Sequence, residues 1–331
     1  QAFLAYQVDL FQNPVASHGQ PFYYHFVVLL LGCFPMFILA FGSMLFKKPI
    51  YGDATAYRWM KTLFWVVLIV FSLVTTKIVH YSSMCYIPLA IVGGVWLSKF
   101  TVLKTISRAT LTIIGALWVV ILCACGLLFS NEVMQYLVTT VKDDFVLAQL
   151  QTNVEGTFIP LILALFLVAP LIKTIIKPSK QSIASLLITN TLVISLLMIS
   201  FVPKVEKSVQ GEWIDQLETY QGKEMAHFTL GFKSYAHYFY TQQQELPSVT
   251  KLKLRFLKQT GIESIYNLDQ HAKKDFDFIV REYIIKETNI PITLSAKVQK
   301  FEEIKTLYPN LTQVFEGNGY GVWERTKELD K

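Results

Sequence analysis

The chain has 331 residues, of which 53% are hydrophobic and only 16% carry a charged side chain. About a quarter of the residues of a soluble domain are charged, so this composition excludes an ordinary soluble enzyme and indicates a membrane protein. The formal net charge is +6, and it belongs to residues 1–202, where twelve basic residues outnumber six acidic ones, because residues 203–331 contain eighteen of each. A positive charge confined to the loops of an apolar region disfavours nucleic-acid binding.

Apolar runs of membrane length predict a bundle of about six transmembrane helices. Residues 1–21 are too polar to span a bilayer, and we expect them to lie at its interface. The spans follow at residues 22–46, 61–76, 81–97, 109–129, 157–172 and 182–202. Between the fourth and fifth span, residues 130–156 are polar and net acidic, and their apolar positions recur at helical spacing, which predicts a short helix at the membrane surface.

Residues 203–331 intersperse apolar and charged positions, which predicts a small folded α/β domain after the transmembrane domain of residues 1–202. We predict helices at residues 212–220, 235–242 and 296–307 and strands at 225–230 and 276–284. A hairpin is predicted at 312–325, with its turn at Gly317-Asn318-Gly319. The secondary structure of residues 249–258 is left unassigned. The mainly α fold class is therefore a polytopic helix bundle followed by a small α/β domain.

The basic loops predict the orientation of the chain. Residues 47–61, 98–108 and 173–181 carry the excess of Lys and Arg and fall on one side of the membrane when the spans alternate. By the positive-inside rule that side is the cytoplasm, so the turn near residue 77, the acidic loop and the α/β domain are expected on the extracytoplasmic face.

Polar residues interrupt the apolar runs at residues 75–88, where Lys77, His80 and Tyr81 join the second span to the third. An ionisable residue at membrane depth is a candidate for function, and a cation in a medium of low dielectric constant suits a phosphate. A lysine that extends its ammonium to the membrane surface is the alternative for Lys77. Gln20, Tyr23 and Tyr24 open the first span, where tyrosines could bind a sugar or form an interfacial aromatic belt.

Two strings carry a family resemblance. His18-Gly19-Gln20-Pro21-Phe22-Tyr23-Tyr24, and Thr76-Lys77 followed by Tyr81 and Tyr86-Ile87-Pro88, resemble the second half of membrane glycosyltransferases that use polyprenyl-phosphate sugars. The resemblance is greatest to the bacterial aminoarabinose transferase and protein mannosyltransferase group, which has the GT-C fold. In the tail, residues 231–240 (GFKSYAHYFY) are similar to a segment of the outer domain of these enzymes, which implies Lys233 and Tyr235 as acceptor-side candidates.

The resemblance implies an inverting glycosyltransferase in the bacterial inner membrane, which moves a sugar from a polyprenyl-phosphate carrier to a lipid, protein or glycan acceptor on the extracytoplasmic face. Lys77 would contact the carrier phosphate, with His80, Tyr81, Tyr23, Tyr24 and Gln20 around the cavity, and His18 would help to hold a divalent metal. His80 departs from the family pattern. The catalytic Asp of the family has no match here, since Asp9 lies beside the first motif, and we expect the chain to be the C-terminal part of a longer enzyme.

Two other classes of function stay open at this point. One is a transporter or flippase for a lipid-linked sugar, which would predict internal repeats and broken helices in two corresponding halves. The other is a membrane anchor without catalytic activity that presents the outer domain to a partner.

Overall fold

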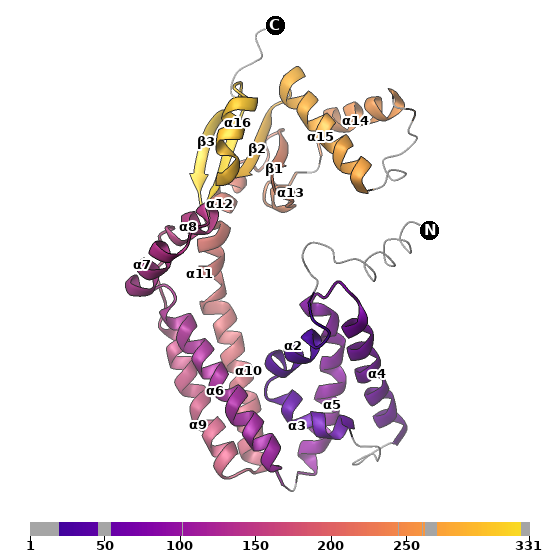
Figure 1. Ribbon diagram of the computed structural model, residues 1–331, viewed down its shortest axis with the longest axis vertical. Helices are drawn as coiled ribbons and strands as arrows, with labels where there is room; N and C mark the ends of the chain where they lie inside the picture. Colours follow the sequence, from indigo (N-terminus) through magenta and orange to yellow (C-terminus); the bar gives the residue numbers. More distant parts are fainter. Residues whose placement is uncertain are drawn as a thin grey trace. The chain divides into compact units, whose positions relative to one another are not determined.

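The computed structural model describes residues 20–45, 54–100, 102–243, 245–259, 261 and 270–325. The chain forms two compact units (Figure 1). The first, which we call the membrane unit, consists of Gln1–Leu127 and Thr157–Phe201, and the second, the tail unit, consists of Leu128–Gly156 and Val202–Lys331. The sequence division at residue 202 differs from this one in residues 128–156, which the structure groups with the tail.

The membrane unit is built from apolar helices. Among the described residues, five helical stretches have the length and hydropathy of a membrane span: Thr55–Leu73, Val79–Ser98, Thr105–Leu127, Ile159–Ile176 and Lys180–Glu218, the last of which continues into the tail unit. The elements of the unit are α2 (Tyr24–Gly32), α3 (Met36–Leu45), α4 (Ala54–Leu73), the 3₁₀ helix η1 (Val79–Cys85), α5 (Tyr86–Ser98), α6 (Thr105–Leu127), α9 (Ile159–Ile176) and α10 (Lys180–Ser200). The predicted helical bundle is confirmed, and the chain is a multi-pass membrane protein.

The first predicted span, at residues 22–46, differs from the prediction because it is broken into α2 and α3. A break frees backbone groups that a helix would satisfy, and these groups need partners in an apolar medium. The Leu31 carbonyl accepts a hydrogen bond of 3.1 Å from Trp118 Nε1 on α6, and the Phe34 carbonyl accepts one of 2.8 Å from Asn190 Nδ2 on α10. Two distant spans therefore hold the break in place.

Small residues let the helices of the membrane unit approach closely. A Cβ atom on Gly93 of α5 would lie 2.1 Å from Met36 Sδ of α3, and one on Gly115 of α6 would lie 2.5 Å from Leu171 Cδ2 of α9. Close approach at small residues is how transmembrane helices gain van der Waals contact, because lipid tails provide no hydrophobic drive for association.

The tail unit contains a mixed four-stranded sheet in the order β1-β2-β4-β3, in which β1 is parallel to β2 and the other pairs are antiparallel. At the tight turn between β3 and β4, Asn318 and Gly319 have φ values of 51° and 76°, so the predicted hairpin is confirmed. The elements are α7 (Asn131–Thr140), α8 (Asp144–Leu150), α11 (Val202–Glu206), the π-helix η2 (Lys207–Gly211), α12 (Glu212–Glu218), β1 (Ala226–Leu230), α13 (Ala236–Tyr240), α14 (Pro247–Gln259), α15 (Gln270–Glu287), β2 (Ile292–Lys297), η4 (Val298–Lys300), α16 (Phe301–Leu307), β3 (Thr312–Gly317) and β4 (Tyr320–Glu324).

Two assignments in the tail were wrong. Residues 276–284, predicted as a strand, belong to helix α15, whose buried positions Phe276, Val280 and Ile284 recur every four residues. The strand that the prediction missed is β2, which pairs on both sides and is buried along most of its length, so it lacks the alternation of a half-buried strand. The helix predicted at residues 296–307 begins only at Phe301, and the unassigned residues 249–258 lie in α14.

Side chains of the tail explain why residues 128–156 belong to this unit. Asn318 Nδ2 donates to Thr152 Oγ1 at 2.8 Å and to the Ser208 carbonyl at 2.9 Å, and Gln149 Nε2 donates to the Val209 carbonyl at 3.1 Å. A buried amide with several partners fixes the hairpin turn against both α8 and the π-helix.

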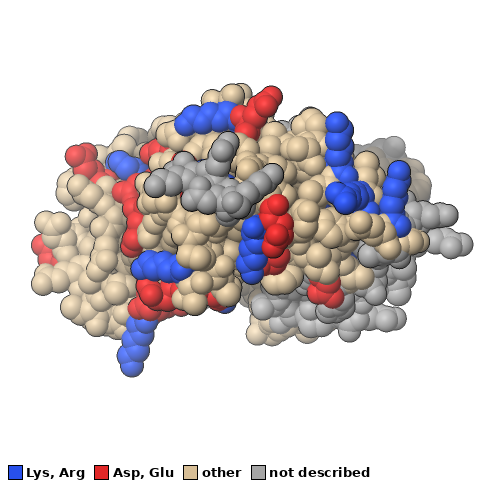
Figure 2. Space-filling model, turned by 90° about the horizontal axis from the view of Figure 1, so that it is seen from above, with Lys and Arg blue, Asp and Glu red and all other residues tan. Residues whose placement is uncertain are grey.

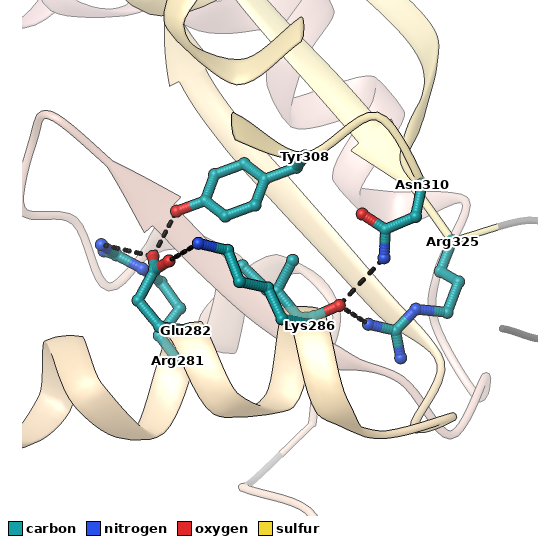
Figure 3. Close-up of polar contacts among 7 residues, drawn as sticks. Arg281, Glu282, Lys286, Tyr308, Asn310 and Arg325 are labelled. Carbon is teal, nitrogen blue, oxygen red and sulfur yellow. Dashed lines mark hydrogen bonds and ion pairs between the residues drawn. The ribbon is translucent and has the colours of Figure 1, made fainter. Parts of the chain in front are cut away.

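Arg325 closes the other end of the sheet region by capping α15 (Figure 3). Its guanidinium is buried and donates to the carbonyls of Ile284, Ile285, Thr288 and Ile290, which lie at or just beyond the C-terminal end of the helix. A cation is favourable there because the last carbonyls of a helix lack partners and carry partial negative charge.

Candidate functional site

Lys77 is a buried cation in the membrane unit. Lys77 lies between α4 and η1 and is only 5% exposed to solvent, and its Nζ donates a hydrogen bond of 2.8 Å to the Val74 carbonyl. An ammonium has three N–H donors, and the structure gives Lys77 no ion pair with any residue that it describes. This burial disagrees with a lysine whose ammonium extends to water.

The described part of the membrane unit contains no carboxylate that could neutralise Lys77. Asp9 and Asp53 are the two acidic residues in the sequence of this unit, and both lie outside the described residues. A buried charge without a partner is costly, so an ionisable residue at such a place is a candidate for function.

Aromatic and imidazole rings from α2, α4 and η1 form a cluster in the membrane unit. His25, on α2, is fully buried, and its ring centroid lies 5.2 Å from that of Tyr24 and 6.3 Å from that of Phe71. The ring centroids of Phe71 and Tyr81 are 5.0 Å apart, and those of Tyr81 and His80 are also 5.0 Å apart. Among the residues that the structure describes, neither ring nitrogen of His25 has a hydrogen-bond partner. Lys77 and His25 are thus two buried ionisable residues of the membrane unit, and the described residues partner them only in part.

Local structure explains how the turn holds Lys77 inward. Helix α4 ends at Leu73, Ile78 is extended with φ −119° and ψ 136°, and the Tyr81 amide then donates to the Ile78 carbonyl at 3.0 Å. Ser82 is buried and its Oγ donates to the Val79 carbonyl at 3.1 Å, which stabilises the 3₁₀ turn. The extended residues between two helices thus position the lysine.

The structure brings together only some of the predicted cavity residues. Tyr24 and Tyr81 lie in the ring cluster with His25 and Phe71, and His80 contacts the ring of Tyr81 from an exposed position. Gln20 and Tyr23 are exposed, and Tyr23 contacts the ring of Phe22 at 6.3 Å rather than the cluster. Their predicted role in binding the donor stays a prediction.

The acceptor-side candidates of the tail unit contact each other. Lys233 Nζ lies 5.5 Å from the centroid of the Tyr235 ring, and both residues are exposed. This is a surface cation–π pair, so an acceptor role for Lys233 and Tyr235 stays a prediction.

The predicted metal ligand, His18, lies outside the described residues. In the part of the chain that the structure describes, no group of three or more His, Cys, Asp or Glu side chains could hold a metal ion. The described residues therefore do not fit a metal site, and we derive no step through a metal.

His25 and Phe71 are site residues that the sequence prediction did not select. A signal for His25 was present, because it is an ionisable residue followed directly by a long apolar run, which marks an intramembrane polar group. Phe71 carries no such signal, since one phenylalanine in an apolar helix is indistinguishable from its neighbours before the helices are packed.

No protein-family model and no curated protein sequence matches this chain. The crystal structure of ArnT from Cupriavidus metallidurans bound to undecaprenyl phosphate is similar, with a TM-score of 0.57 and 12% identity, over 98% of this chain and 55% of that chain. The same ArnT in the apo state has a TM-score of 0.52 and 13% identity, over 97% of this chain and 57% of that chain. The resemblance predicted from the motifs is confirmed for the fold, which is that of ArnT, a GT-C glycosyltransferase. This chain spans a little over half the length of these neighbours.

Proposed function

We propose that this chain is part of a membrane glycosyltransferase that takes a sugar from a polyprenyl-phosphate carrier. The observation that carries the proposal is the buried ammonium of Lys77, in a unit whose described residues contain no carboxylate. A phosphate is an anion that such a cation can bind strongly, since charge-assisted hydrogen bonds strengthen where water is excluded. The fold shared with ArnT, whose structure was solved with undecaprenyl phosphate bound, supports this choice of anion.

In this mechanism Lys77 holds the leaving group. A carboxylate outside the described residues takes the proton of the acceptor hydroxyl or phosphate, and the acceptor oxygen attacks the anomeric carbon of the sugar. The bond from that carbon to the carrier oxygen breaks, and its electron pair goes to the carrier phosphate, which gains a negative charge. The Lys77 ammonium stabilises that charge as it develops, and inversion at the anomeric carbon follows from a single displacement.

His25 is placed to support Lys77. Its ring is held between Tyr24 and Phe71, and one of its unpartnered nitrogens can donate a hydrogen bond to a phosphate oxygen. Tyr81 adds a ring that can lie against the sugar. The excess of Lys and Arg in the loops supports a cytoplasmic position for those loops, so in this proposal the cluster and the tail unit face the extracytoplasmic side of a bacterial inner membrane.

The test is binding of undecaprenyl phosphate to the purified full chain and to two variants. Lys77→Met keeps the length of the side chain but removes its charge, and we expect the dissociation constant to rise roughly 10–100-fold, because a hydrogen bond to a charged group contributes about 1.5–3 kcal/mol. The matched control is Lys180→Met, which removes an exposed ammonium that donates to the Ser98 carbonyl, and it should bind as the natural chain does.

Equal affinity of Lys77→Met and the natural chain would contradict the phosphate role. Sugar transfer in cells separates the proposal from the other classes. A transferase loses transfer with Lys77→Met although the protein still inserts normally, whereas an anchor without catalytic activity would keep its cellular function.

A further inference from the structure

Helix α14 presents a basic face to the outside of the tail unit. Lys251, Leu254, Arg255 and Lys258 are spaced as i, i+3, i+4 and i+7, so they share one side of the helix, and all four are exposed. Leu254 is a large apolar residue with 53% exposure among three cations. The other side of α14 is fixed in the core through Val249 and Leu257.

The cations of this face differ from other lysines of the tail unit in having no ion pair with a described residue. Lys253, on the same helix, pairs with Glu245 at 2.8 Å, Lys300 pairs with Glu303 at 2.6 Å, and Lys305 pairs with Glu302 at 2.7 Å. Among the described residues, no acidic side chain pairs with Lys251, Arg255 or Lys258.

The charge of the tail is also unevenly distributed. Residues 203–331 contain equal numbers of basic and acidic residues, but α14 contains no acidic residue. Figure 2 shows Lys and Arg side chains grouped at one place on the surface without acidic side chains beside them. The basic face of α14 is therefore a local excess of positive charge in a neutral domain, which points to an anionic partner.

We propose that the basic face of α14 docks on anionic lipid headgroups of the membrane that the chain spans. Arg and Lys contact the phosphates, and Leu254 enters the boundary between headgroups and acyl chains, which is the division of roles in an interfacial amphipathic helix. We favour a lipid surface over a folded acidic protein as the partner of this face. Lipid headgroups can move to contact each of the three separate cations, and the acyl chains below them can accommodate the one apolar side chain.

The neighbouring helix α13 supplies a second feature of an interfacial surface. Tyr238 of α13 lines a small cleft with Val249 and Lys253 of α14, so the two helices are adjacent. Tyr235, the residue before α13, and Phe239 of α13 are exposed by 67% and 75%. Aromatic rings are enriched at the level of lipid headgroups, where they accompany the cations.

The experiment measures the depth of α14 in bilayers. A nitroxide is attached to Leu254→Cys in the full chain, with the four native cysteines replaced, and its accessibility to oxygen and to a water-soluble nickel complex is compared. In bilayers in which about one lipid in three is phosphatidylglycerol, we expect the nitroxide to be accessible to oxygen and protected from the nickel complex. In pure phosphatidylcholine the label should be open to nickel, and salt of about 0.5 M should reduce protection in the anionic bilayer.

A matched pair of charge reversals provides the control. Arg255→Glu with Lys258→Glu is expected to abolish the protection, since each cation near an anionic surface shifts the partition of a docked segment roughly fivefold. Lys300→Glu with Lys305→Glu changes the net charge equally on another exposed surface and should leave the protection intact. Equal nickel access in both bilayers would overturn the proposal. Protection that is the same without anionic lipid, or that persists in detergent, would also overturn it in favour of a protein contact.

Discussion

Arg325 allows a quantitative test of how the tail unit is held together. Arg325→Met removes a guanidinium that donates to four carbonyls, at 2.9 Å to Ile284 and 2.8 Å to Ile290, with two further bonds to Ile285 and Thr288. The Ile285 carbonyl keeps a bond of 2.9 Å from Asn310 Nδ2 (Figure 3), and the Ile284 carbonyl keeps one of 2.9 Å from Thr288 Oγ1. The carbonyls of Thr288 and Ile290 therefore depend most on Arg325.

The expected cost follows from two opposing effects. Each hydrogen bond from a charged donor contributes about 1.5–3 kcal/mol, but the buried guanidinium also loses its hydration, and its Nε has no partner. We therefore expect the free energy of unfolding of the tail unit to fall by about 3 kcal/mol, well below the sum of the bonds. For a unit of this size that corresponds to a decrease in Tm of roughly 6–12 °C. The stability of Arg325→Lys should lie between those of the natural chain and Arg325→Met, because one ammonium can donate to fewer carbonyls than the planar guanidinium does.

The assay is thermal unfolding of the full chain in detergent, followed by hydrogen exchange of the C-terminal turn of α15, which should open first in Arg325→Met. The matched control is Lys286→Met on the same helix. It removes a pair of 3.0 Å with Glu282 from a side chain that is 46% exposed, and should cost less than about 1 kcal/mol. A loss in Arg325→Met no larger than in this control would refute the reasoning.

Two further predictions concern other buried polar groups. Asn190→Leu removes the donor to the Phe34 carbonyl in the break between α2 and α3, and it should lower the stability of the membrane unit in detergent by about 1–2 kcal/mol. The control is Thr191→Val at an exposed position, which should change that stability by less than about 0.5 kcal/mol. Equal effects of the two variants would contradict the role given to Asn190. Burial, aided by His227, lowers the pKa of His237 to about 4, so between pH 6.5 and 4 the unfolded chain binds a proton that the fold does not. The stability of the tail unit should therefore decrease by about 3 kcal/mol as the pH falls through this window, and His237→Phe should remove most of that slope in pH-dependent unfolding; an unchanged slope would exclude His237 as its source.

The outline of this protein could be predicted from local sequence. Apolar runs without charge become helices because a backbone in lipid must satisfy its own hydrogen bonds, and this requirement acts on each run separately. The hairpin at Asn318-Gly319 follows equally locally, since a tight turn with two positive φ angles favours those residues. Lys77 and Tyr81 also stood out as site candidates, because a lysine at the edge of an apolar run is unusual wherever the run packs.

Tertiary structure decided the rest, because it depends on partners far away in the sequence. Residues 276–284 are rich in aromatic and β-branched residues, which are typical of strands, but a helix buries Phe276, Val280 and Ile284 together. The break at residues 33–35 is stable because Trp118 and Asn190 arrive with donors from other spans. The burial of Lys77 and the contact between His25 and Phe71 arise in the same way. The sequence of one helix does not determine which of its polar groups the neighbouring helices will shield from water.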